Sequence, residues 1–299
     1  MIRAGTLDDA PGVARLLAAV YPDEVESARG LRYAWASVPE RVGRRAWAAE
    51  VDGELVAWAN ASRFTASAAQ GAGFAKLTVH PDHRGCGLGT ALWDEVERHL
   101  AELGAIHVSA EGVDDDAARR FMGRRGFRVA SVERTSGLDP RSLPEPPEPP
   151  AGVEVRAFAA FADPKPVYEL TVETARDIPT EHPIDDIRWD EWLEGAWRSP
   201  DVDHDASLVL LADGEPATLT YMLVNPESRR AVSSLTGTAR RFRGRGLARL
   251  AKHHALARLA AAGVTLAVAN NHEANPAMLA VNERLGYRPL AARLTFARG

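Results

Sequence analysis

The chain has 299 residues with a formal net charge of -5, and 45% of its residues are hydrophobic and 26% charged. This length predicts two domains, each large enough to bury its own core. The acidic balance argues against a nucleic-acid partner, which needs a basic face. The single cysteine, Cys86, excludes an internal disulfide and a cysteine-based metal site, and we expect no metal ion. No apolar run approaches the roughly 20 residues needed to cross a bilayer. The residues after Met1 read as a strand, not a signal peptide, so we expect a cytoplasmic protein with no membrane partner.

The first half of the chain predicts alternating strands and helices. Asp52-Gly53 lies between two apolar runs, which is a strong signal for a β-hairpin. The predicted strands are 2–6, 45–51, 54–62, 74–79, 106–110 and 127–132, and the predicted helices are 7–20, 24–37, 87–103 and 114–125.

A proline-rich segment at residues 143–150 separates this half from the rest. Prolines at this density favour an extended spacer and exclude the segment from the interior of a sheet. We therefore predict an N-terminal domain at residues 1–140, a linker at 141–152 and a C-terminal domain at 153–299.

The order of elements then restarts. A strand at 155–157, a helix at 164–176 and a hairpin of 208–212 and 217–224 around Asp213-Gly214 repeat the earlier pattern. Arg243 lies 159 residues after Arg84, and Gly263 lies 159 residues after Gly104. A constant offset across different elements indicates a duplication.

An arginine- and glycine-rich stretch stands at the same place in each half. Residues 84–90 read Arg-Gly-Cys-Gly-Leu-Gly-Thr, and residues 243–248 read Arg-Gly-Arg-Gly-Leu-Ala. Each stretch follows a predicted strand and opens a predicted helix. Glycine lets the backbone approach a ligand closely, and a helix start offers unpaired N–H groups and a positive dipole end. The stretch therefore predicts a site for a phosphate or pyrophosphate, to which the arginine adds charge.

Other interpretations of these glycines fit less well. No Gly-Lys-Ser/Thr follows, so this is not a Walker A loop. The spacing and the lack of an acidic residue about 20 positions on do not fit a dinucleotide fingerprint. A glycine-rich turn without a ligand stays open as an alternative, although two copies weaken it.

The pattern Arg-x-x-Gly-x-Gly/Ala resembles the acetyl-coenzyme A motif of the GNAT superfamily of N-acetyltransferases. The resemblance covers nearly all of the chain as a tandem pair. It implies an α/β fold with two tandem GNAT-type domains, each a mixed, mostly antiparallel sheet flanked by helices. It also implies that acetyl-coenzyme A is the acyl donor and that the strand before each loop binds the coenzyme arm. The coenzyme-binding residues it implies are Leu77, Val79, Arg84, Gly85, Gly87, Gly89, Thr90, Thr236, Thr238, Arg243, Gly244, Gly246, Ala248, Asn271 and Asn275.

Both halves depart from the family at one position. A tyrosine that protonates the leaving thiolate usually stands five residues before the closing aromatic residue, where this chain has Met122 and Asn282. Positioning of amine and thioester alone can supply roughly 7 kcal/mol, so the departure does not exclude transfer. The second half also has Asn271 and Asn275, as in many acetylating members, so we expect the C-terminal domain to be the active half, with Asn282 in its site.

An amine must lose a proton before it attacks, so a general base is needed. The acidic segment at residues 169–205 is the predicted source, with Asp177 and Glu181 preferred. An acidic wall would attract a cationic amine, although a solvated helix face explains most charge runs. Trp189, Trp192 and Trp197 could line an apolar pocket or form core.

We therefore predict an acetyl-coenzyme A-dependent N-acetyltransferase that acts on the primary amine of a small cationic molecule, as a monomer or homodimer. A non-catalytic sensor of acyl-coenzyme A is an alternative, because neither half has the tyrosine. Acetylation of protein amines is a further alternative, which predicts an open acceptor groove instead of a closed pocket.

Overall fold

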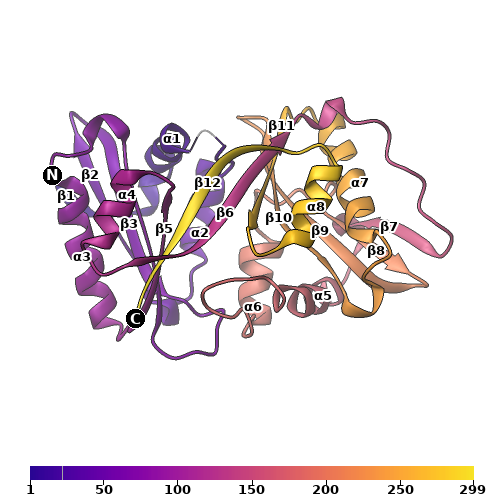
Figure 1. The fold of residues 1–299 in the computed structure, drawn as a ribbon, viewed down its shortest axis with the longest axis horizontal. Coiled ribbons are helices and arrows are strands. Elements are labelled where there is room, and N and C mark those ends of the chain that lie inside the picture. The colour runs from indigo at the N-terminus through magenta and orange to yellow at the C-terminus, as the bar shows by residue number, and fades with distance from the viewer. Residues whose placement is uncertain (22) are drawn as a thin grey trace. The chain divides into compact units, whose positions relative to one another are not determined.

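A computed structural model describes residues 1–21 and 23–299, and the chain forms two compact units (Figure 1). Unit 1 consists of Met1–Glu133, Thr180–Asp186 and Ala291–Gly299, and unit 2 consists of Arg134–Pro179 and Ile187–Leu290. Unit 1 thus includes two segments that come from the second half of the sequence. The domain boundaries that we predicted from the proline-rich linker differ from this division into units, and they stay a prediction.

Unit 1 is a mixed sheet with helices on both faces. Its strand order is β1-β2-β3-β4-β5-β12, in which only β4 and β5 of these neighbouring strands pair in parallel. β6 begins in unit 1 and ends in unit 2, and β12 begins in unit 2 and ends in unit 1. The elements are β1 (Ile2–Ala4), α1 (Ala10–Val20), α2 (Ala28–Ala36), β2 (Arg45–Val51), β3 (Glu54–Arg63), β4 (Ala72–Val79), α3 (Leu88–Glu102), β5 (His107–Val113), α4 (Asp116–Gly123), β6 (Arg128–Leu138) and β12 (Arg288–Arg298).

The alternation of side chains along β3 explains the two layers of helices. Trp58 points into a cluster with the α1 residues Val13 and Leu16, whereas Ala57 and Ala59 point into a cluster with residues of α3. Successive residues of a strand face opposite sides of the sheet. Small alanines on the α3 side let that helix pack close to the strand.

Unit 2 has the same plan. Its strand order is β6-β11-β10-β9-β8-β7, in which β10 and β11 pair in parallel. Its remaining elements are β7 (Val153–Ala157), α5 (Lys165–Ala175), α6 (Trp189–Trp192) with a π-helix at Leu193–Trp197, β8 (Leu208–Ala212), β9 (Glu215–Asn225), β10 (Arg230–Thr238), α7 (Leu247–Ala261), β11 (Leu266–His272) and α8 (Pro276–Arg284). In each unit the sheet strands are mixed, mostly antiparallel and flanked by helices, which confirms the predicted fold class.

Both predicted hairpins are present, and their turns have the expected geometry. Asp52 and Gly53 have φ values of 51° and 82°, and Asp213 and Gly214 have 53° and 84°. Positive φ at both central residues matches the right-handed twist of the two strands, and Asp-Gly adopts it readily. The short helices after residue 188 were not predicted. Trp192 is buried there, and Trp189 and Trp197 pack against the same core cluster, so these tryptophans form core.

The last strand belongs to unit 1. Arg293–Arg298 of β12 pairs antiparallel with Val113–Val108 of β5, and Figure 1 shows β12 in yellow beside β5. Leu294 and Phe296 are 1% and 2% exposed and join the core around α3. The C-terminal strand thus supplies core to the fold of the N-terminal half.

We predict that Leu294→Ala lowers the free energy of unfolding by about 2–5 kcal/mol, because it removes buried methyl groups and leaves a cavity. Leu290→Ala is the matched control, since Leu290 is 50% exposed and should change stability by less than about 0.5 kcal/mol. Urea unfolding followed by tryptophan fluorescence measures both. Equal losses for the two leucines would contradict the assignment of this strand to the core of unit 1.

Candidate active site

A cavity of about 380 Å³ lies in unit 1. The end of α1, the ends of β4 and β5, the start of α3, and α4 surround it. Its lining residues are Val20, Tyr21, Leu77, Thr78, Val79, Arg84, Gly85, Gly87, Gly89, Thr90, Trp93, Glu111, Gly112, Val113, Asp115, Ala117, Ala118, Phe121, Met122 and Phe296. All seven of the coenzyme-binding residues predicted in the first half are in this lining.

The cavity begins where β4 and β5 separate. Their parallel register runs from Ala72–His107 to Lys76–Glu111. Beyond it, β4 stays paired with β3 as far as Val79, and β5 stays paired with β12 as far as Val113. The inner edges of both strand ends therefore face the cavity with backbone groups that an extended ligand can pair with.

The glycine-rich loop at residues 84–90 forms one end of the cavity. Gly85 and Gly87 have φ values of 81° and 88°, which favour glycine. No atom lies within 4 Å of a Cβ built at either glycine, so the backbone conformation, and not crowding, requires glycine here. Gly87 caps the start of α3, a helix of 15 residues. The first N–H groups of such a helix have no partner within it.

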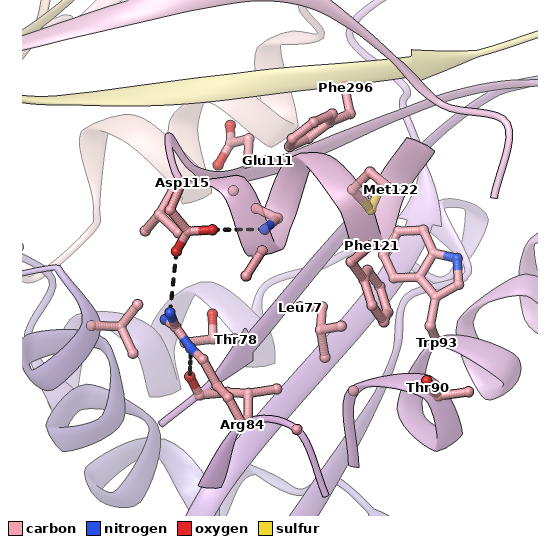
Figure 2. A pocket seen from close by; sticks show the side chains of 18 of the residues that line it. Leu77, Thr78, Arg84, Thr90, Trp93, Glu111, Asp115, Phe121, Met122 and Phe296 are labelled. Carbon is pink, nitrogen blue, oxygen red and sulfur yellow. Dashed lines mark hydrogen bonds and ion pairs between the residues drawn. The ribbon is translucent and has the colours of Figure 1, made fainter. Parts of the chain in front are cut away.

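Arg84 is held beside this loop by two contacts, which Figure 2 shows. Its Nε donates to the carbonyl oxygen of Val79 at 3.2 Å, and a terminal nitrogen donates to Asp115 at 3.2 Å. Asp115 also caps α4 by accepting from the backbone N–H of Ala118 at 2.6 Å. The guanidinium is thus fixed between the end of β4 and the start of α4, next to the loop amides.

The other end of the cavity carries ionisable groups. Tyr21 and Glu111 line it, and the Lys76 ammonium lies 3.9 Å from the Glu111 carboxylate and 5.6 Å from the Tyr21 ring centroid. Arg293 of β12 lies over the same ring at 4.7 Å and binds Asp23 at 2.9 Å. Lys76 of β4 and Arg293 of β12 therefore both bring a positive charge to this end of the cavity.

Acidic groups dominate this end. Burial alone would lower the pKa of Lys76, but the nearby carboxylates of Glu111, Glu26 and Glu24 raise it instead. Burial raises the pKa of Glu133, and the Glu111 carboxylate raises it further. The raised pKa of Lys76 shows that the carboxylates at this end stabilise a buried cation.

The second loop has a different electrostatic setting. Arg243 repeats the contact of Arg84, because its Nε donates to the carbonyl of Thr238 at 3.0 Å. Asp177 binds both Arg243 and Arg240, the latter at 2.7 Å. Hydrogen bonds from these two arginines lower the pKa of Asp177 to about 2. Asp177 is therefore a weak base, which counts against its predicted role.

The other polar residues predicted in unit 2 have hydrogen-bond partners within that unit. Thr236 pairs with Thr220, and Thr238 with Thr218, each at 2.9 Å. Asn275 caps α8 by accepting from Met278 at 3.2 Å. Asn271 accepts from Asn282, which is only 2% exposed. Gly244, Gly246 and Ala248 lie in the second loop and the first turn of α7.

Polar residues in unit 2 replace apolar ones of the cavity. Lys252 stands where unit 1 has Trp93, six residues after the glycine that caps the helix, and Asn282 stands where unit 1 has Met122. Lys252 is 1% exposed, its ammonium lies 5.1 Å from the Tyr287 ring centroid, and burial lowers its pKa to about 7.

The predicted base Glu181 belongs to unit 1, where it binds Arg128 at 3.2 Å, whereas Asp177 belongs to unit 2.

Sequence reasoning missed Tyr21, Thr78 and Glu111. The strand predicted at 106–110 ends one residue before Glu111, so no local pattern placed this carboxylate in the site. Within the described chain, no cluster of three or more His, Cys, Asp or Glu could hold a metal ion, and no helix is long and apolar enough to span a bilayer.

The sequence matches known acetyltransferases. Residues 11–127, which contain the first loop, match the model of the acetyltransferase (GNAT) family. The chain is 30% identical over 224 residues to a mycothiol acetyltransferase of Streptomyces coelicolor, a match that covers 71% of this chain and 67% of that protein. It is 33% identical over 138 residues to a mycothiol acetyltransferase of a Parafrankia species, with 41% of each chain covered. The protein therefore belongs to the GNAT acetyltransferase family and is an acyltransferase.

Solved structures share the fold over the whole chain. A GCN5-related N-acetyltransferase from Sphaerobacter thermophilus superimposes with a TM-score of 0.72 at 21% identity, over 100% of this chain and 95% of that one. A tandem GNAT protein from the clavulanic acid biosynthesis pathway gives a TM-score of 0.72 at 19% identity, over 99% and 97%. The tandem plan, which also resembles that of mycothiol synthase, is thus found in solved proteins.

We predict that stability rises with pH above about 7 because of Lys252. Its folded pKa is about 7, below the unfolded value of about 10.4. Between these values the unfolded chain holds a proton that the folded chain has lost, so the free energy of unfolding increases with pH. Lys252→Met should remove most of this slope and stabilise the protein at neutral pH by on the order of 2 kcal/mol.

Urea unfolding followed by circular dichroism at about pH 6, 7 and 9 measures the slope. Lys165→Met is the matched control, since Lys165 is exposed and its loss should leave the slope as in the wild type. A Lys252→Met variant with the wild-type pH dependence would contradict the burial of a neutral lysine.

Proposed function

We propose that the protein transfers the acetyl group of acetyl-coenzyme A to the primary amine of a small cationic molecule, and that the reaction takes place in the cavity of unit 1. The observation that carries the proposal is the continuity of this cavity. It joins an anion-binding loop to a carboxylate-lined end through a gap between two strands.

The coenzyme fits the loop end by its charge and length. The pyrophosphate would bind the N–H groups at the start of α3, with Arg84 beside it. The pantetheine arm, which is extended and contains amides, would pair with the inner edge of Leu77–Val79, as an added strand does. This places the thioester towards Glu111 and Tyr21. GNAT enzymes use acetyl-coenzyme A as the donor, which supports the same choice.

Glu111 is the best-placed general base in this site. Its carboxylate lines the cavity at the end of the strand gap, 3.9 Å from the Lys76 ammonium. An ionised carboxylate attracts the protonated amine and can then accept its proton, directly or through a water molecule. Met122 lies in the lining at the position of the family tyrosine and cannot act as an acid, so positioning must supply most of the acceleration.

The acceptor should be small and cationic. The cavity is only about 380 Å³, which the coenzyme arm shares, and its inner end is acidic. The first amines to assay are the acceptor of the mycothiol acetyltransferases, diamines and amino sugars. The expectation that the C-terminal half is active stays a prediction, but the buried polar residues Lys252 and Asn282, which stand where unit 1 has apolar ones, favour the N-terminal half.

We predict that Arg84→Ala weakens acetyl-coenzyme A binding by about ten- to a hundredfold, as expected when a charge-assisted hydrogen bond to a phosphate is lost. Arg243→Ala should have a much smaller effect, because we place the coenzyme in the cavity of unit 1, which Arg84 lines. Isothermal titration calorimetry on both variants measures the difference. A larger loss for Arg243→Ala would move the coenzyme site to unit 2.

We predict that Glu111→Gln lowers kcat for acetyl transfer by about 10²–10⁴-fold, as the loss of a general base does, while acetyl-coenzyme A still binds. Thiol release with the amine panel measures the rate. Asp177→Asn and Glu181→Gln test the bases predicted from the sequence in the same assay. If coenzyme binds but no amine causes thiol release in the wild type, the protein is a sensor, and release with lysine-containing peptides alone would indicate a protein acetyltransferase.

A further inference from the structure

One buried hydroxyl in the cavity wall has no partner. Thr78 of β4 is 3% exposed, and its Oγ forms no hydrogen bond with any described residue. Thr218 of β9, which is also buried, by contrast pairs with Thr238. Leaving a buried hydroxyl unsatisfied costs about 1–3 kcal/mol, so a group of this kind in a cavity wall points to a ligand.

Thr78 stands at the centre of the proposed site. It lies two residues beyond Lys76, where the pairing of β4 with β5 ends, and on the same face of the strand as Lys76. That face carries the group that approaches Glu111 and Tyr21. Figure 2 shows Thr78 among the lining side chains, between the loop end with Arg84 and the end with Glu111.

Given the proposed function, we propose that the Thr78 hydroxyl donates a hydrogen bond to the carbonyl oxygen of the acetyl thioester. The amine nitrogen attacks the carbonyl carbon, a C–N bond forms, and the electron pair of the C=O bond moves onto this oxygen. When the pair returns, the C–S bond breaks and the thiolate leaves, to be protonated from solvent. Glu111 accepts one proton of the ammonium before the attack, and the second N–H proton passes to solvent as the amide forms. Thr78 keeps its own proton and stabilises the negative oxygen.

The second half of the chain lacks this donor. Its counterpart of Thr78 is Gly237, which precedes the last residue of β10 as Thr78 precedes the last residue of β4. The side chain of Thr174 fills the space beside Gly237, where a Cβ would be 2.4 Å away. The Thr174 hydroxyl donates to the carbonyl of Leu170 at 2.8 Å, so it is already satisfied within its own helix.

The test compares Thr78→Val, which keeps the shape and removes the hydroxyl, with Thr78→Ser, which keeps the hydroxyl. For Thr78→Val we expect acetyl-coenzyme A to bind about three- to tenfold more weakly, with the affinity for coenzyme A unchanged, because coenzyme A has no carbonyl at this place. The kcat for acetyl transfer should fall by about 100-fold, and Thr78→Ser should restore most of it. Thr135→Val is the control, since Thr135 is also buried with an unpartnered Oγ but lies in unit 2.

Equal loss of affinity for both coenzymes in Thr78→Val would indicate a packing role and overturn the inference. An unchanged kcat would also overturn it, as would a Thr135→Val variant with the same loss of rate. Calorimetry on the wild type separates the two proposals. If the wild type binds neither coenzyme, the proposed function itself fails, whereas normal binding and transfer in Thr78→Val refute only the role of the hydroxyl.

Discussion

The site depends on one break in the hydrogen bonding of a sheet. The ladder between β4 and β5 ends at Lys76–Glu111, although both strands continue. β3 still holds β4, and β12 still holds β5. Because each strand is fixed on its outer side, the gap between them is part of the fold and requires no local unfolding. The unpaired backbone edges, the cavity and the placing of Thr78 and Glu111 all follow from this gap.

The β5 side of the gap depends on the C-terminal strand β12, whose residues Ala291–Arg298 belong to unit 1. β12 holds β5 beyond the break, Phe296 lines the cavity, and Arg293 supplies a cation at the acidic end. The domain predicted at residues 153–299 assigned this segment to the second half, since local sequence says nothing of which strand it pairs with. Pairings between residues far apart in the chain are not contained in local patterns, and this one joins residues near 110 to residues near 296.

Features that depend only on residues adjacent in the sequence were predictable. The Asp-Gly turns, the glycine-rich loop and the helix that follows it are set by backbone preferences over a few positions, and the structure has them at the expected residues. Glu111 and Thr78 were missed because their chemistry arises from where two strands separate. Asp177 was chosen as a base from its acidic surroundings, but the arginines that lower its pKa come from another segment, 63 and 66 residues away.

The duplication preserved the backbone of the site better than its side chains. Both units have a parallel strand pair that separates, a loop with two glycines of positive φ, and an arginine that binds the end of the preceding strand. Unit 2 nevertheless has Gly237 for Thr78, Lys252 for Trp93 and Asn282 for Met122. The conformation of the glycine-rich loop is a property of the backbone, and both halves keep it. The apolar channel, the unpartnered Thr78 hydroxyl and the Glu111 carboxylate on which the proposed transfer depends line one cavity in unit 1.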